Sequence, residues 1–161
     1  MIVRISRLQL RMYISILEKR TGINSQQYDN SDKHTLLWDF DRVSLSKITK
    51  SLMLLQRKYK LPNIMIIQSS VKGSFHAYCF TARTFREVIH ILSDTPEIDI
   101  TYLRLGMVRG YFTLRITPRK NEPNFKVVRT LMSVYPNETN INSMTINEYL
   151  TNNKGGKNVK K

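Results

Sequence analysis

Apolar and polar residues alternate along the chain with two spacings, one typical of strands and one typical of helices. Continuous apolar runs over 35–40 and 63–69 have the length and composition of buried strands. Between them, apolar residues repeat at helical spacing from a good N-cap at Ser44 to a stop before Pro62. The pattern therefore predicts a strand, a helix over 45–59 and a second strand.

The same two spacings return in the next part of the chain. Residues 71–73 have the composition of a hairpin turn, and 74–80 alternate as its return strand. Thr81 or Thr84 can cap a second helix, whose apolar stripe runs over 85–92. These elements extend the predicted order to strand, helix, strand, strand, helix.

The segments that follow combine strand-like and helix-like composition. β-Branched and aromatic residues are frequent in 98–105 and 110–117, which predicts two further strands. Apolar spacing favours short helices over 125–132 and 142–150. Residues 23–33 are polar and are expected to form a loop.

The two ends of the chain differ from its middle. The apolar residues of 1–22 fit strand and helix spacing, and their alternation favours a strand. Residues 151–161 are predicted to form a basic disordered tail, which leaves one domain over 1–150.

The predicted order of elements is that of a split β-α-β fold. In this α+β arrangement an antiparallel sheet carries its helices on one face. We therefore expect an RRM-like sheet whose other face is open to bind nucleic acid or nucleotides.

The charge balance indicates the class of partner. The 161 residues include 26 Lys and Arg against 12 Asp and Glu, a formal net charge of +14. Such an excess attracts nucleic acid, anionic membrane or acidic proteins. No segment pairs a basic face with a bulky apolar face, which favours nucleic acid over membrane.

Cysteine use and hydropathy indicate the cellular compartment of the protein. The lone Cys79 excludes an internal disulfide and a cysteine zinc site. No apolar run reaches the ~20 residues of a membrane helix, and arginines interrupt the N-terminal segment. A cytoplasmic protein without a membrane anchor is the expectation.

Two carboxylates end the first predicted strand. Asp39 and Asp41 are separated by Phe40 and so point to one face of a strand. They repel each other unless a cation lies between them, and Mg²⁺ or Mn²⁺ is the natural choice. The alternative is that Asp41 caps the following helix near Ser44.

The second candidate motif lies on the return strand of the hairpin. Ser74, His76 and Tyr78 share one face, and Lys72 and Gly73 precede them. A histidine beside acids and phosphates tends to stay protonated, so both His76 and Ser74 can donate to a phosphate. The alternative is a structural histidine within the sheet.

A third acid and a set of cations complete the candidate chemistry. Asp99, with Glu97 close by, is placed at the start of the next predicted strand, where it can add a metal ligand or be simply solvated. Arginine and lysine side chains suited to phosphate, and aromatic rings suited to base stacking, follow it. These are Arg104, Arg109, Arg115, Arg119 and Lys120, with Tyr102, Tyr111 and Phe112, and Tyr78 on the earlier strand is a further ring of this kind. The alternative is a basic sheet edge that discourages aggregation.

The motifs together resemble the catalytic core of the archaeo-eukaryotic primase superfamily. That family has an RRM-like sheet with a DxD or DxE motif, a later SxH motif and then an acid after a hydrophobic residue. Asp39 and Asp41 match the first motif, Ser74 and His76 the second, and Asp99 after Ile98 the third. The matched stretch covers about half of the chain.

The resemblance implies a metal-dependent nucleotidyltransferase of DNA replication, a primase or primer-extending polymerase. Asp39, Asp41 and Asp99 would hold Mg²⁺ or Mn²⁺, and Ser74 and His76 would contact the nucleotide. Lys72 and Arg115 would assist at the nucleotide, and the other cations and tyrosines would contact nucleic acid. The implied partners are a single-stranded DNA or RNA template, nucleoside triphosphates and other replication proteins.

Two other functions are considered from the residues. A non-catalytic RRM-like protein would bind single strands through tyrosines and cations, independently of metal. A rolling-circle replication initiator needs paired histidines and a nucleophilic tyrosine, whereas His34, His76 and His90 are isolated in the sequence. The oligomeric state does not follow from the sequence.

Overall fold

The computed structural model describes six stretches of the chain: 2–5, 8–11, 22–27, 32–70, 73–116 and 125–138. In the first two, strands β1 (Ile2–Ile5) and β2 (Leu8–Arg11) pair as an antiparallel hairpin. This agrees with the strand favoured for the N-terminal segment. The helix expected over 142–150, the tail, Lys72, Arg119 and Lys120 lie outside the described residues.

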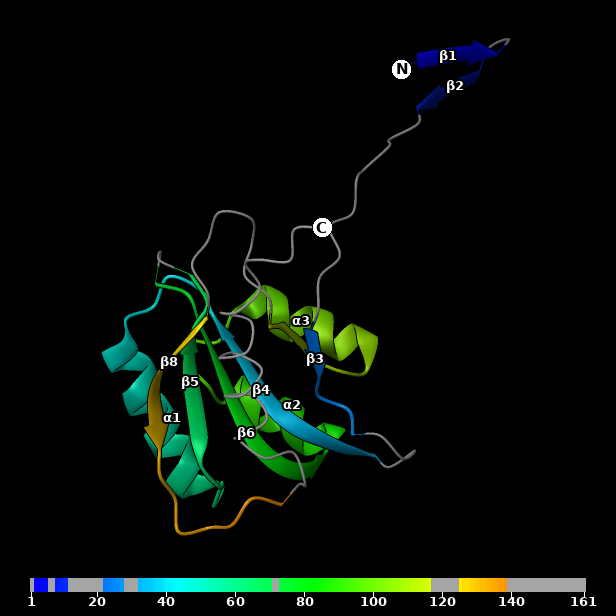
Figure 1. Ribbon diagram of the computed structural model, residues 1–161. Coiled ribbons are helices and arrows are strands. Elements are labelled where there is room, and N and C mark those ends of the chain that lie inside the picture. Colours follow the sequence, from blue (N-terminus) through cyan, green and yellow to red (C-terminus); the bar gives the residue numbers. More distant parts are fainter. Residues whose placement is uncertain are drawn as a thin grey trace, which may run out of the picture.

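A four-stranded antiparallel sheet forms the centre of the fold (Figure 1). Its strands, in spatial order, are β4 (Lys33–Phe40), β6 (Phe75–Thr84), β5 (Ile64–Gln68) and β8 (Lys126–Leu131). β6 pairs antiparallel with both β4 and β5, so β4 and β5 run parallel with β6 between them. This is the predicted split β-α-β arrangement of an α+β fold.

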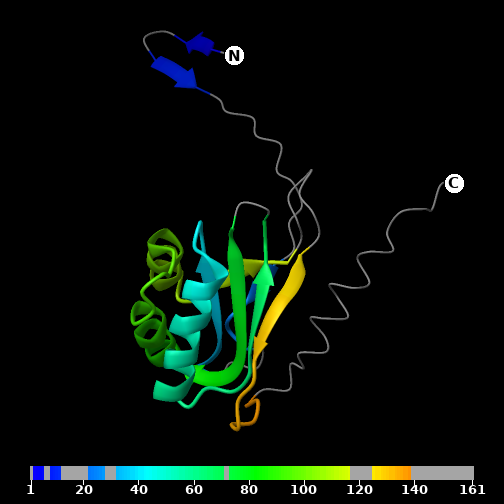
Figure 2. The ribbon, with the colours of Figure 1, turned by 90° about the vertical axis from the view of Figure 1, so that its left-hand side faces the viewer.

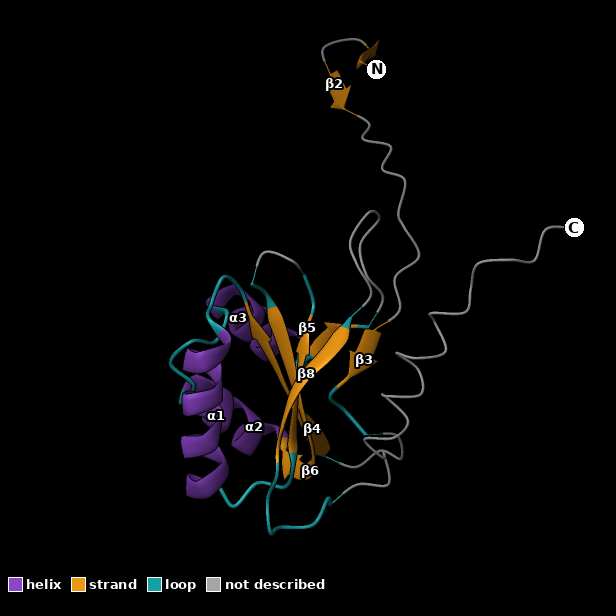
Figure 3. Ribbon diagram, turned by 60° about the vertical axis from the view of Figure 1, so that its left-hand side comes forward, coloured by secondary structure: helices purple, strands orange, loops and turns teal. Residues whose placement is uncertain are grey.

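Three helices cover one face of this sheet (Figures 2 and 3). α1 (Leu45–Lys58) begins at the predicted cap, where the Ser44 side chain accepts from the Lys47 amide. α2 (Phe85–Ser93) begins at Thr84, which forms a capping box with Glu87. α3 (Ile100–Arg109) follows α2, so the prediction of helices on one face is confirmed.

Three predicted elements are wrong. The segment expected as a strand over 98–105 lies largely in α3, because Asp99 accepts from the amides of Thr101 and Tyr102 and starts a helix. The segment expected as a helix over 125–132 forms β8, because its backbone pairs with β5. The loop expected over 23–33 contains most of β3 (Gly22–Asn24).

The strand predicted over 110–117 is present but short. β7 (Thr113–Arg115) pairs with β3 in a small separate sheet. Ser25 joins this sheet to β4, because its amide donates to Phe112 and its carbonyl accepts from Thr35.

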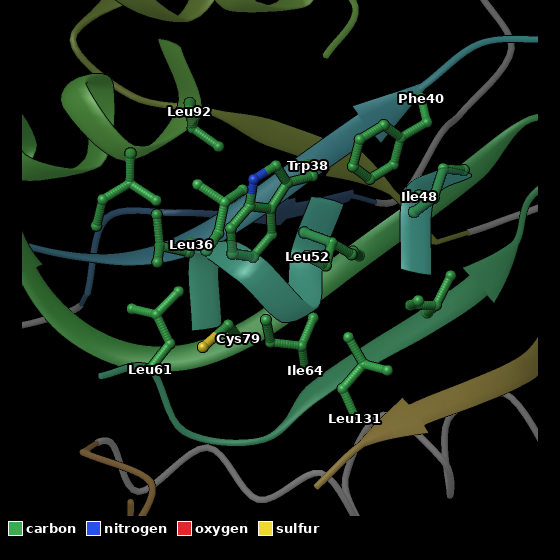
Figure 4. Packing of buried hydrophobic residues seen from close by; sticks show 14 of the residues in the cluster. Leu36, Trp38, Phe40, Ile48, Leu52, Leu61, Ile64, Cys79, Leu92 and Leu131 are labelled. Atoms are coloured by element: carbon green, nitrogen blue, oxygen red, sulfur yellow. The ribbon is translucent and has the colours of Figure 1, made fainter. Parts of the chain in front are cut away.

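The main core lies between the helices and the sheet (Figure 4). Trp38 at its centre is fully buried and donates from its indole nitrogen to Thr95 at 3.1 Å. The opposite face of the sheet is not open as expected, because a second buried cluster covers part of it. Leu114 from β7 and Phe125 before β8 belong to this cluster, which brings β7 close to the end of β4.

Gly106 in α3 offers a test of this packing. A Cβ atom at this position would overlap the ring of Phe112, which is buried. Gly106→Ala should therefore lower the free energy of unfolding by about 1–3 kcal/mol, measured by urea denaturation, although alanine normally favours a helix interior. Val108→Ala, at an exposed position of the same helix, should change it little. A Gly106→Ala protein as stable as the wild type would contradict this packing.

Candidate active site

The pairing of β4 with β6 places the two sequence motifs opposite each other. Asp39 is the cross-strand partner of His76, and Phe40 is that of Phe75. One step further along, the Ser74 hydroxyl donates to the Asp41 carboxylate at 2.7 Å. Since cross-strand partners point to the same face, both residues of each motif meet at one end of the sheet.

Asp41 and Ser74 form the exposed part of this site. The Asp41 side chain is 53 % exposed and lies 3.6 Å from the Arg42 guanidinium. Arg42 and Gly73 both have positive φ, 57° and 77°, and the Val43 amide donates to the Gly73 carbonyl. The two turns are thus fixed to each other. Asp41 does not cap α1, because Ser44 does.

His76 occupies the buried part of the site. Its Nε2 lies 3.6 Å from Asp39 Oδ1, and only 5 % of the residue is exposed. Burial lowers the pKa of His76 from 6.5 to about 3, and the positive charge of Arg115 adds to this effect. The imidazole is therefore neutral at pH 7, which corrects the expectation of a protonated phosphate donor.

Tyr78 is buried behind His76 and does not offer its ring to a base. Its hydroxyl lies 3.3 Å from His76 Nδ1, and the residue is fully buried. Burial raises the pKa of Tyr78, so the phenol stays neutral. The expectation that Tyr78 stacks on nucleic acid is thus wrong, and the same burial excludes Phe112 from that role.

Arg115 reaches the site from β7. Its guanidinium carbon lies 5.6 Å from the centre of the Phe125 ring, and its charge acts on both His76 and Tyr78. The structure therefore brings Arg115 close to His76 of the SxH motif.

Asp99 lies at the start of α3 and not at the start of a strand. Its Oδ1 accepts from the amides of Thr101 and Tyr102 at 2.7 and 3.1 Å, so the carboxylate caps the helix. Its own amide donates to the Asp39 carbonyl at 3.0 Å, which fixes α3 to the end of β4. Glu97 points elsewhere, since it accepts from Ser51 of α1.

A cleft of about 270 Å³ runs along α3, beside Asp39 of β4 and residues 111–113. Asp39, Asp99, Arg109 and Tyr111 are among its lining residues, so predicted acids, a cation and an aromatic ring share one surface. Arg104 is exposed on α3 and is not part of the lining.

The helical face that forms this cleft was missed at the level of sequence. Asp99, Tyr102, Gly106 and Arg109 are spaced by three or four residues, which is the spacing of one face of a helix. That spacing was the available signal, but the aromatic and β-branched composition of the segment concealed it.

Fewer side chains are available to hold a cation than the three carboxylates that the sequence predicts. Within the described stretches, no three side chains among His, Cys, Asp and Glu lie close enough together to hold a metal ion. Asp39 and Asp41 remain as two carboxylates at one strand end. Mg²⁺ commonly takes one or two carboxylates, with phosphate and water as its other ligands, so these two side chains are of the donor type that this ion prefers.

Comparison with known proteins gives no relative. No family model matches the chain, and no curated protein and no solved structure matches it. None of the helices in the described stretches is both long and apolar enough to cross a membrane.

The buried neutral His76 makes stability depend on pH. Its pKa is 6.5 in an unfolded chain and about 3 when folded, so its stabilising contribution is complete above 6.5 and is lost as pH falls toward 3. In urea titrations over this range, the free energy of unfolding of the wild type should fall with pH by up to about 1.4 kcal/mol per pH unit, and His76→Gln should remove this part of the pH dependence. His90→Gln, at an exposed position, should keep that slope. Equal slopes in the His76→Gln and wild-type proteins would refute a buried neutral imidazole.

Proposed function

We propose that this chain is the catalytic core of a metal-dependent nucleotidyltransferase, a primase or primer-extending polymerase of DNA replication. The proposal rests on one observation, that Asp39 is the cross-strand partner of His76 while the Ser74 hydroxyl donates to Asp41 beside them. Two motifs that lie more than thirty residues apart in the sequence meet in register at one strand end.

The carboxylates of Asp39 and Asp41 would hold Mg²⁺ or Mn²⁺. Such an ion supplies positive charge that activates a primer hydroxyl and stabilises the leaving pyrophosphate. The Ser74 hydroxyl orients the Asp41 carboxylate through its 2.7 Å hydrogen bond. Asp39, whose side chain is 31 % exposed, faces His76 on its protected side.

His76 and Tyr78 are assigned a positioning role. A neutral imidazole held by a buried phenol keeps its ring fixed beside Asp39 without adding charge. The nucleotide is instead assigned to the adjacent cleft, where Arg109 can bind phosphate and Tyr111 can stack on a base.

The basic charge of the chain suits a single-stranded DNA or RNA template. A net charge of +14 on 161 residues raises the local concentration of polyanions. The same proposal has three further parts. The end of the sheet binds nucleic acid as in RRM-like proteins, the protein acts at a cytoplasmic replication site, and it contacts other replication proteins.

A second candidate function is single-stranded nucleic-acid binding without catalysis. The use of Asp99 as a helix cap favours it, because this leaves two carboxylates where the resemblance implies three. Binding would then be salt-dependent but independent of divalent metal.

The central test removes the two carboxylate charges. Asp39→Asn with Asp41→Asn should reduce nucleotide incorporation on a primed or unprimed single-stranded template by about 100-fold or more with Mn²⁺ or Mg²⁺, because the cation is lost. Asp94→Asn is the matched control, since Asp94 pairs with Lys58 on α1. Equal activity of the double variant and the wild type would refute the proposal. Metal-independent template binding with no incorporation by either protein would favour the second candidate.

The charge of Asp99 can be tested separately from its role as a helix cap. Asparagine caps helices as well as aspartate does, so Asp99→Asn should keep the stability measured by urea denaturation. If Asp99 acts only as a cap, incorporation should also stay within about threefold of the wild type. Asp99→Ala should cost about 1 kcal/mol of stability. A loss of incorporation in a stable Asp99→Asn protein would show that its charge takes part in catalysis.

A further inference from the structure

A second and larger hollow lies on the helical side of the molecule. Its volume is about 450 Å³, and its lining comes from the end of α1, the end of β6 and α2. The lining residues are Tyr59, Arg83, Arg86, Glu87, His90 and Ile91. This volume is within the usual range of small-ligand sites, about 300–1,000 Å³.

This hollow is separate from the site at Asp39. Arg83 is the cross-strand partner of His34 near the start of β4, whereas Asp39 and His76 pair near its end. Five residues of strand between positions 34 and 39 correspond to about 17 Å. One ligand of nucleotide size therefore does not fill both places.

Basic groups dominate the accessible part of the hollow. Arg86 and His90 are exposed and lie one helical turn apart on α2. Within the described stretches, no hydrogen bond or ion pair engages the Arg86 guanidinium. Arg83 stands beside them at the end of β6, where Glu138 holds its guanidinium at 3.2 Å.

The acid in the lining is already engaged. The Glu87 carboxylate accepts from the Thr84 amide and hydroxyl, both at 2.8 Å, as part of the capping box. These hydrogen bonds lower the pKa of Glu87. Its charge is therefore directed toward the start of α2, and among the described residues no carboxylate pairs with the Arg86 guanidinium.

The flat part of the lining is the ring of Tyr59, and the Lys58 ammonium lies over one of its faces, 5.2 Å from the ring centre. The rings of Tyr59 and His90 are perpendicular, with their centres 5.8 Å apart, and Ile91 is 3 % exposed. The Tyr59 hydroxyl donates to Asp94 at 3.0 Å, which fixes the orientation of its ring. A planar group can pack against this fixed ring while an attached anion reaches Arg86.

We infer that this hollow binds a phosphate group attached to a nucleobase. The base packs against the Tyr59 ring, and the phosphate accepts from Arg86. A free mononucleotide and the end of a nucleic-acid strand present this same chemistry. The site is independent of the nucleotidyltransferase proposed at Asp39.

The test uses the full chain with ¹³C-labelled isoleucine methyls. Adenosine 5′-monophosphate should shift the Ile91 methyl signals, and Arg86→Ala should weaken this binding about tenfold, because one charged hydrogen bond is lost. Arg57→Ala removes a cation from α1 outside the lining and should bind as the wild type does. Asp39→Asn should also bind normally, which separates this site from the proposed active site.

Further ligands distinguish the source of the phosphate. If a 5′-phosphorylated oligodeoxyadenylate binds where the mononucleotide does not, and Arg86→Ala weakens that binding, the result supports a strand end as the natural ligand. Inorganic phosphate that binds as tightly as the mononucleotide would overturn the role of the base. The absence of any shift at Ile91, or equal affinities of Arg86→Ala and Arg57→Ala, would overturn the site.

Discussion

The register between β4 and β6 is the constraint on which the rest of the site depends. Side chains in a strand alternate between faces, so a slip of one residue would turn Ser74 and His76 toward the helices. Two features hold the register: the buried side chains of both strands, and the turns at Arg42 and Gly73, which are fixed to each other. The same packing that stabilises the sheet therefore aligns the two motifs.

Burial divides the site into a rigid half and an accessible half. His76 and Tyr78 lie under the second apolar cluster, so their contacts are protected from water. Asp41 and Ser74 lie at the rim, where a cation or phosphate can reach them. His76 and Tyr78 are neutral, so the negative charge of the site lies on Asp39 and Asp41, whose side chains are 31 % and 53 % exposed.

The sequence predicts correctly those elements whose first and last residues are marked by local signals, such as an N-cap, a proline or a turn. Ser44 and Pro62 bracket α1, and the hairpin from β5 to β6 follows from its turn and alternation. The register of Asp39 with His76 could be anticipated only as far as a split β-α-β order places the first and third strands side by side. α3 and β8 were missed, because their states depend on a capping carboxylate and on pairing with β5, neither of which composition reveals. The neutral state of His76 was missed for a similar reason, since it depends on cover from β7 and Phe125.

The position of β8 has a consequence for the molecule in solution. In the described part of the chain, this strand has β5 on one side and no strand on the other, so it leaves backbone donors and acceptors at a sheet margin. Lys126 and Arg129 are exposed along it. Like charges brought face to face would repel a second copy of the strand, which disfavours polymerisation through this margin. Some of the positive charge of the chain thus disfavours pairing between two copies of β8, whatever ligands the protein binds.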